Sequence, residues 1–211
     1  LELGGSDPFV VLEDADVARA AAAAVTGRFL NAGQSCIAAK RFVVHRAVAD
    51  AFTAAVRDGL ADVVVGDPRD EATTMGPMAR ADLRDELADQ VARSVAAGAE
   101  PVLTGGVRSG PGFFFAPALL RGVTRDHAVG GEETFGPAAA ILVADDDDHA
   151  VALANDTRYG LGASVWTGDR TRGEAIAARL EAGTIGVNAA ERSDPRLPFG
   201  GVKDSGYGRE L

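Results

Sequence analysis

Short apolar runs alternate along the chain with longer segments in which apolar residues recur every three or four positions. The runs predict buried strands, and the longer segments predict amphipathic helices. The predicted strands cover residues 8–12, 41–45, 101–103, 138–144, 161–167 and 183–187. The predicted helices cover residues 17–30, 48–65, 79–97 and 171–180, and another begins in the acidic stretch 145–148. This alternation favours an α/β domain with a largely parallel sheet.

Three stretches do not follow either pattern. Residues 104–112 hold four glycines and a proline and are predicted to form a loop. Residues 113–120 are apolar but contain Pro117, so they are predicted to form an irregular or edge strand. Residues 130–137 place two carboxylates and an aromatic between glycines and a proline, which favours an exposed binding loop or a plain acidic turn.

The composition is that of a soluble globular protein, with 46% hydrophobic and 25% charged residues in a chain of 211. We find no linker, so one domain spanning residues 1–211 is expected. The net charge of −10 argues against nucleic acid or an anionic membrane as partner and favours a small molecule. The chain starts at Leu1 and stops in a polar, glycine-rich segment, so we expect a fragment of a longer protein. The lone cysteine excludes an internal disulfide and fits a cytoplasmic location.

That cysteine, Cys36, follows a turn rich in small residues and is the candidate nucleophile. Gly33 lets the backbone approach closely, while Lys40 and Arg41 either place positive charge near the sulfur or point into water. A small buried hydrophobe is the alternative role for Cys36. No metal site is predicted, because the consecutive aspartates at 145–148 do not converge on one ion.

Four short segments, taken in order, resemble the aldehyde dehydrogenase superfamily over the whole chain. They are Glu2-Leu3-Gly4-Gly5, Gly33-Gln34-Ser35-Cys36, Glu132-Glu133-Thr134-Phe135-Gly136-Pro137 and Pro198-Phe199-Gly200-Gly201. The resemblance implies a three-layer catalytic domain with a largely parallel sheet flanked by helices. It also implies an amino-terminal Rossmann-like domain that this sequence lacks, and a parent enzyme that is a homodimer or homotetramer.

The resemblance assigns Cys36 as the nucleophile that forms a thiohemiacetal and then a thioester, and Glu2 as the base that activates water. It implies that the backbone N–H of Cys36 stabilises the oxyanion together with an asparagine of the missing half, so the fragment alone should be nearly inert.

The cofactor implied by the resemblance is NAD or NADP, with the choice between them made in the missing domain. Glu133 is similar to the residue that binds the nicotinamide ribose, and Phe135 to the aromatic beside the ring. Asn188 is similar to a residue that supports the active-site loops. For Gly4 and Gly5 a structural role in a tight backbone passage is expected.

The amino-acid sequence of residues 33–41 and 193–201 is similar to that of the shorter bacterial succinate-semialdehyde dehydrogenases. The resemblance implies that Ser193 binds the substrate carboxylate and that Phe199 forms an aromatic wall, although core packing is the alternative for Phe199. The better-known branch has an arginine where this chain has Leu30, so the hypothesised basic partner is Arg192, Arg196 or an arginine of the missing domain.

Two other functions remain open from the sequence. One is a cysteine acyl-transfer enzyme or thioesterase that uses Cys36 and Glu2 without a redox cofactor. Such enzymes usually activate cysteine with histidine, and His45, His127 and His149 have no motif that ties them to Cys36. The other is a folding or interaction module that is inert when isolated.

Overall fold

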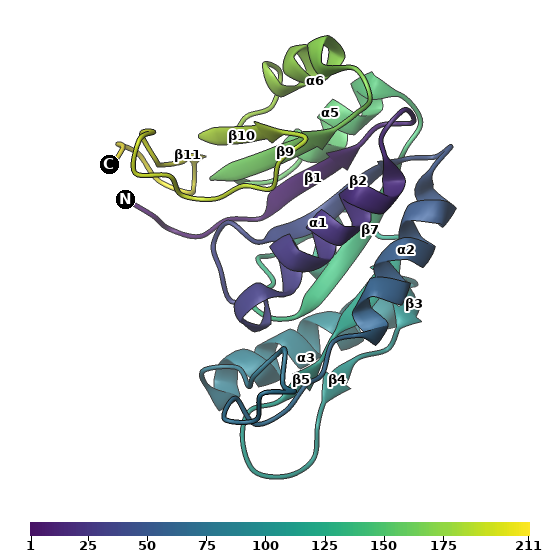
Figure 1. Cartoon of the computed structure of the whole chain (residues 1–211), viewed down its shortest axis with the longest axis vertical. Helices are drawn as coiled ribbons and strands as arrows, with labels where there is room; N and C mark the ends of the chain where they lie inside the picture. The colour runs from purple at the N-terminus through teal and green to yellow at the C-terminus, as the bar shows by residue number, and fades with distance from the viewer.

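The main feature of the computed structural model, which describes residues 1–211, is a sheet of seven strands with helices on both faces (Figure 1). Neighbouring strands are parallel, except that β3 is antiparallel to β6. This confirms the predicted α/β class. In sheet order the strands are β10 (Thr184–Val187), β9 (Gly162–Trp166), β1 (Asp7–Val11), β2 (Ala39–His45), β7 (Ala138–Ala144), β6 (Ala118–Arg121) and β3 (Glu100–Leu103).

Helices cover the sheet in two layers because the central strands are apolar on both sides. In β1, Phe9 and Val11 join one core cluster while Val10 joins the other. The first cluster lies under α1 (Val17–Phe29) and α2 (Ala49–Ala61), which run across the same face of the sheet in Figure 1. The second cluster includes residues from α3 (Ala81–Ala96), α5 (Asp147–Asn155) and α6 (Arg170–Ala177).

Helix α1 begins at a predicted acidic cap, whereas α2 and α3 begin without a side-chain cap and are shorter than their apolar pattern. The side chain of Asp16 accepts a hydrogen bond from the Arg19 N–H and starts α1, as the acidic residues before it predict. Helix α2 ends at Ala61 rather than at residue 65. Val63 and Val65 still pack against the core from outside the helix, so they extend the apolar spacing without extending the helix.

The stretch around Pro117 differs from its prediction. Strand β4 (Gly106–Val107), inside the predicted loop, pairs with β5 (Phe115–Ala116), and β6 begins after Pro117. Of the two alternatives predicted for residues 113–120, the irregular strand is confirmed, because the stretch divides at Pro117 into β5 and β6. The edge strand is wrong, because β6 lies between β7 and β3. Pro117 falls between two strands, where its missing N–H takes no bond from the main sheet.

Three small elements complete the fold. Helix α4 (Ala128–Gly131) is a single turn that includes the first two residues, Gly130 and Gly131, of the predicted binding loop. Strands β8 (Tyr159–Gly160) and β11 (Val202–Lys203) form a separate antiparallel pair. No helix in this structure combines the length and the apolar character needed to cross a bilayer.

Candidate active site

Three of the predicted motif segments lie immediately before three neighbouring strands. Gly4-Gly5 precedes β1, the Cys36 loop precedes β2, and Glu133 lies shortly before β7. Since β1, β2 and β7 are adjacent and parallel, their amino ends lie at the same edge of the sheet. Segments far apart in the sequence therefore meet at this amino-terminal edge.

Gly5 is the point at which the three segments meet. Its N–H donates a hydrogen bond to Glu133 Oε1 at 3.0 Å. A Cβ atom on Gly5 would lie 2.5 Å from the carbonyl oxygen of Cys36, so only glycine allows this approach. A side chain at Gly4, where φ is +97°, would collide with the Glu133 carboxylate. The Gly-Gly pair thus gives Cys36 and Glu133 a common neighbour.

The backbone that leads to Cys36 has an uncommon conformation. Asn31, Ala32 and Gly33 have φ angles of 55°, 53° and 71°. Each of the first two costs about 1–2 kcal/mol, because a Cβ in the left-handed region crowds the next carbonyl. A side chain at Gly33 would meet the backbone of Gly136. Contacts from the surrounding structure must therefore hold this loop.

Cys36 is partly buried at the amino edge rather than sealed in the core. Burial raises the pKa of its thiol, the positive charge of Lys40 opposes that rise, and the carboxylate of Glu2 adds to it. The charge of Glu2 therefore reaches the sulfur from a residue far away in the sequence. This influence on the pKa of the thiol links Cys36 to Glu2, the residue that the sequence proposed as base.

Glu2 is exposed and has a carboxyl partner that sequence reasoning missed. A hydrogen bond with the side chain of Glu210 is the largest cause of the raised pKa of Glu2. Glu210 is in turn held by Phe199, because the two residues exchange backbone hydrogen bonds of 2.8 Å in both directions. Phe199 itself is buried, with 6% of its surface exposed. Glu210 lies in a polar terminal segment and belongs to none of the four motif segments.

Lys40 and Arg41 are both buried, so neither side chain points into water, the second of the two alternatives that the sequence left open. Lys40 Nζ donates to the carbonyl oxygens of Ser35 and Cys36, both at 2.9 Å, and lies 3.8 Å from Glu133 Oε1. Arg41 donates instead to the carbonyl oxygen of Ser6, just before β1, and to those of Leu153 and Ala154 in α5. Of these two side chains, only that of Lys40 binds the Cys36 loop.

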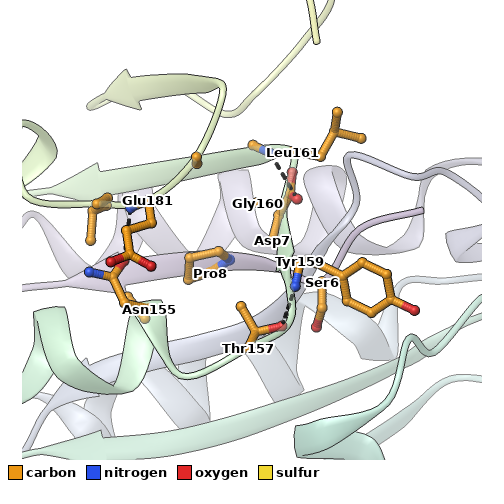
Figure 2. A pocket seen from close by; sticks show the side chains of 13 residues that line it. Ser6, Asp7, Pro8, Asn155, Thr157, Tyr159, Gly160, Leu161 and Glu181 are labelled. Carbon is orange, nitrogen blue, oxygen red and sulfur yellow. Dashed lines mark hydrogen bonds between the residues drawn. The ribbon is translucent and has the colours of Figure 1, made fainter. Parts of the chain in front are cut away.

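A buried carboxylate, Asp7, lies at the start of β1 near Lys40. It accepts a hydrogen bond from the Gly162 N–H at 3.0 Å, while its other oxygen is buried without a partner. Burial raises the pKa of Asp7 to about 6, and the charge of Lys40 is the largest opposing influence. Figure 2 shows Asp7 beside Leu161, at the wall of a cavity of about 10 Å³, roughly the room that one water needs.

Arg28, at the end of α1, ties the Cys36 loop to the Glu133 loop and was also missed. Its guanidinium donates to the carbonyl oxygens of Gly33 at 3.1 Å, Thr134 at 3.0 Å and Ala138 at 2.6 Å, and to Gly136. From the sequence, a basic residue in the last turn of a helix is ordinary capping. No pattern distinguishes it from a solvated arginine.

Comparison with known proteins agrees with this geometry. The Aldehyde dehydrogenase family model matches residues 1–211. The chain belongs to the aldehyde dehydrogenase family. It is 51% identical over 211 residues to "Succinate semialdehyde dehydrogenase [NAD(P)+] Sad" of Escherichia coli (strain K12), and 48% identical to "Succinate-semialdehyde dehydrogenase [NADP(+)]" of Mycolicibacterium paratuberculosis.

These comparisons cover all of this chain but only part of the relatives. The chain spans 46% of the Escherichia coli protein and 45% of the mycobacterial one, so about half the length of each. Among solved structures, Gox0499 superposes with a TM-score of 0.96 and 44% identity, over 100% of this chain and 46% of that one. The fold thus agrees with the predicted three-layer domain of this family.

A groove opens beside Glu133 and has a volume of about 480 Å³. Leu83 of α3 and Phe135 contribute apolar surface to it, and Arg158 and Tyr159 contribute polar surface. The groove therefore offers a carboxylate, an aromatic ring and a cation within one space next to the amino edge. Such a mixture suits a ligand with hydroxyl groups and a flat ring.

No hydrogen bond or ion pair joins the residues predicted to bind substrate to Cys36. Ser193 and Arg196 lie on an exposed stretch, and Arg196 is paired with Asp194 through bonds of 2.9 and 2.6 Å. Asn188 lies at the base of this stretch. Its side chain accepts from the Thr167 N–H at 3.0 Å and donates to the Thr167 carbonyl oxygen at 2.9 Å, which links the ends of β9 and β10.

The three histidines lie away from the thiol. His45 is the last residue of β2, at the opposite edge from Cys36, and its Nε2 is 3.8 Å from Glu13. His127 contacts Thr124, and His149 lies near Asp145. No cluster of three or more His, Cys, Asp or Glu side chains is placed to hold a metal ion. The arrangement offers no histidine base for Cys36.

Proposed function

We propose that the full-length protein oxidises an aldehyde with NAD(P), that succinate semialdehyde is its substrate, and that residues 1–211 form the domain that carries the reactive thiol. Family membership and the succinate-semialdehyde dehydrogenases among the relatives support the reaction. The observation that carries the assignment of residues is the meeting of the segments of Glu2, Cys36 and Glu133 around Gly5.

Cys36 is the proposed nucleophile. Its thiolate attacks the aldehyde carbon and forms a thiohemiacetal, with the backbone N–H of Cys36 as one donor to the oxyanion. Because burial raises the pKa of the thiol, the thiolate must be formed against a cost that the charge of Lys40 reduces. Oxidation then leaves the acyl group on the sulfur as a thioester.

Glu2 is the proposed base for hydrolysis of that thioester. A carboxylate with an ordinary pKa is a weak base at neutral pH, so a raised pKa favours this role. The hydrogen bond with Glu210 supplies such a rise. Since Glu2 is also exposed, water can reach its carboxylate and give up a proton as it attacks the acyl carbon.

Glu133 and Phe135 are the proposed contacts for the nicotinamide half of NAD(P). The groove beside them fits that group, because a carboxylate accepts hydrogen bonds from ribose hydroxyls and an aromatic ring packs against a flat heterocycle. The Gly5 N–H and the Lys40 ammonium, which both lie near Oε1, orient the Glu133 carboxylate. Bound NAD(P) would supply the hydride acceptor of the reaction.

Ser193, with Arg196 as its basic partner, is the proposed site for the substrate carboxylate. Arg192 and Arg196 against Asp194 leave this exposed stretch with a surplus of positive charge, which favours an anionic substrate. Phe199, which follows this stretch and is buried, is proposed as part of the apolar wall of the substrate pocket. A homodimeric or homotetrameric assembly and a cytoplasmic location complete the proposal.

The test uses the purified full-length protein with succinate semialdehyde or butanal, and with NAD+ or NADP+. We expect absorbance of the reduced nicotinamide with succinate semialdehyde, its loss in Cys36→Ser, and a weaker preference over butanal in Ser193→Ala and Arg196→Ala. No reduced cofactor with any aldehyde, together with hydrolysis of an activated ester, would favour the redox-free thioesterase instead. An unchanged preference in both variants would contradict the substrate site.

A further inference from the structure

A lysine ammonium is sealed beneath the Cys36 loop. The Lys40 side chain has 0% exposure, and its Nζ donates to the carbonyl oxygens of Ser35 and Cys36 at 2.9 Å each, with that of Ala38 at 3.5 Å. Three N–H donors thus face three carbonyl groups of the segment that carries the thiol. A buried charge is tolerated when its donors are satisfied in this way.

The same ammonium lies close to Glu133. The distance from Nζ to Glu133 Oε1 is 3.8 Å, and that oxygen also accepts the Gly5 N–H. Gly5 in turn packs on the Cys36 carbonyl that Lys40 binds. Lys40 therefore lies within one closed set of contacts that includes the thiol loop and the proposed cofactor carboxylate.

The charges around Lys40 come from three other elements. Asp7 of β1 and Glu133 before β7 attract its positive charge, and Arg28 of α1 repels it. Burial lowers the pKa of Lys40 to about 8. Lys40 itself is buried, so water and salt screen its charge less than that of an exposed lysine, and it favours the thiolate of Cys36 while Asp7 opposes it.

We propose that Lys40 is a positioning residue for the thiol: its buried ammonium holds the Cys36 loop in its strained conformation and lowers the cost of forming the thiolate. The inference rests on the proposed role of Cys36 as nucleophile. It adds a group outside the four motif segments to the machinery of that site.

Its neighbour Arg41 shows what a purely structural cation does in this fold. Arg41 is equally buried, and its guanidinium binds carbonyl oxygens of Ser6, Leu153 and Ala154, none of which belongs to the Cys36 loop. Lys40 differs because every carbonyl group it binds lies within five residues of it, around the thiol. Its position couples loop shape to thiol charge.

The experiment measures the rate of Cys36 alkylation by iodoacetamide against pH, in the full-length protein without aldehyde or cofactor. The variant is Lys40→Met, which keeps an unbranched apolar stem and removes the charge. The control is Lys203→Met, because Lys203 also binds two carbonyl oxygens, those of Asn155 and Thr157, but in the β8–β11 region. The chain has only one cysteine, so alkylation of this domain reports on Cys36 alone.

In Lys40→Met we expect the midpoint of the alkylation profile to rise by about one pH unit, which slows the reaction at neutral pH about tenfold. We expect Lys203→Met to match the wild type. A Lys40→Met protein that melts lower but keeps the wild-type midpoint would overturn the proposal, since a merely structural role predicts that result. Aldehyde oxidation is assayed separately, so loss of the proposed function and loss of this effect are distinguishable.

A second variant covers the case in which Lys40→Met does not fold. Lys40→Gln keeps two N–H donors for the loop carbonyls and removes only the charge. A raised midpoint in this variant supports the proposal, and an unchanged midpoint overturns it. If neither variant folds while Lys203→Met does, Lys40 serves folding rather than thiol reactivity, and the proposal is wrong.

Discussion

Replacing Arg28 with methionine tests whether one buried guanidinium holds the Cys36 and Glu133 loops together. Arg28 makes five hydrogen bonds, to Gly33, Thr134 (two), Gly136 and Ala138. At about 2 kcal/mol for each bond with a charged donor, they contribute about 10 kcal/mol. Burial lowers the pKa of Arg28 to about 9, a desolvation cost of about 5 kcal/mol that offsets half of this gain.

The difference predicts that Arg28→Met destabilises the domain by about 3–5 kcal/mol, the range seen when one partner of a buried charged contact is removed. The loss should be local as well, because the contacts join two loops rather than two core layers. Amide hydrogen exchange of residues 33–38 and 133–138, with urea unfolding of the full-length protein, measures both effects. Exchange in these two stretches should speed up more than exchange in β10.

Arg57→Met is the matched control. Arg57 is exposed on α2, and its hydrogen bonds go only to the adjacent Asp58. Its loss should change stability by no more than about 0.5 kcal/mol. If Arg28→Met also stayed within about 1 kcal/mol of the wild type with unchanged exchange, the reasoning about the two loops would be refuted.

Two further predictions concern pH and a loop anchor. Burial and the charge of Asp7 raise the pKa of Glu191 to about 7, so its folded state prefers the proton. The stabilisation from that protonated carboxyl is complete below pH about 4.5 and is lost as pH rises through about 7. Glu191→Gln should flatten this decline, which urea unfolding at acidic and alkaline pH measures. Parallel stability profiles of the variant and the wild type would contradict the prediction. Asn188→Ala should cost about 2 kcal/mol, since Thr167 loses two partners and alanine tolerates a φ of 54° less well. A melting temperature equal to the wild type's would show that this link does not matter.

The hydrophobic pattern predicted each of the seven strands of the main sheet and five of the helices. Short apolar runs are typical of strands buried on both faces, and recurrence every three or four residues follows from helix geometry. The pattern missed strands of two residues such as β4, which are too short to show a period. It did not decide between an irregular and an edge strand for residues 113–120, since Pro117 is consistent with any position outside a ladder. The motif segments identified the family without any geometry, and the match over residues 1–211 confirms it.

The polar contacts of the site depended on the fold. Arg28 and Glu210 belong to no motif, and Lys40 lies in the family-like stretch 33–41 without its direction being fixed. A lysine or arginine looks the same in sequence whether it is solvated or sealed under a loop. Strand order decides the matter: β1, β2 and β7 had to be neighbours and parallel for Gly5, Cys36 and Glu133 to meet. Periodicity is a local property that the chain carries within each segment. The pairing of strands depends on contacts between distant segments, and only the folded sheet specifies them.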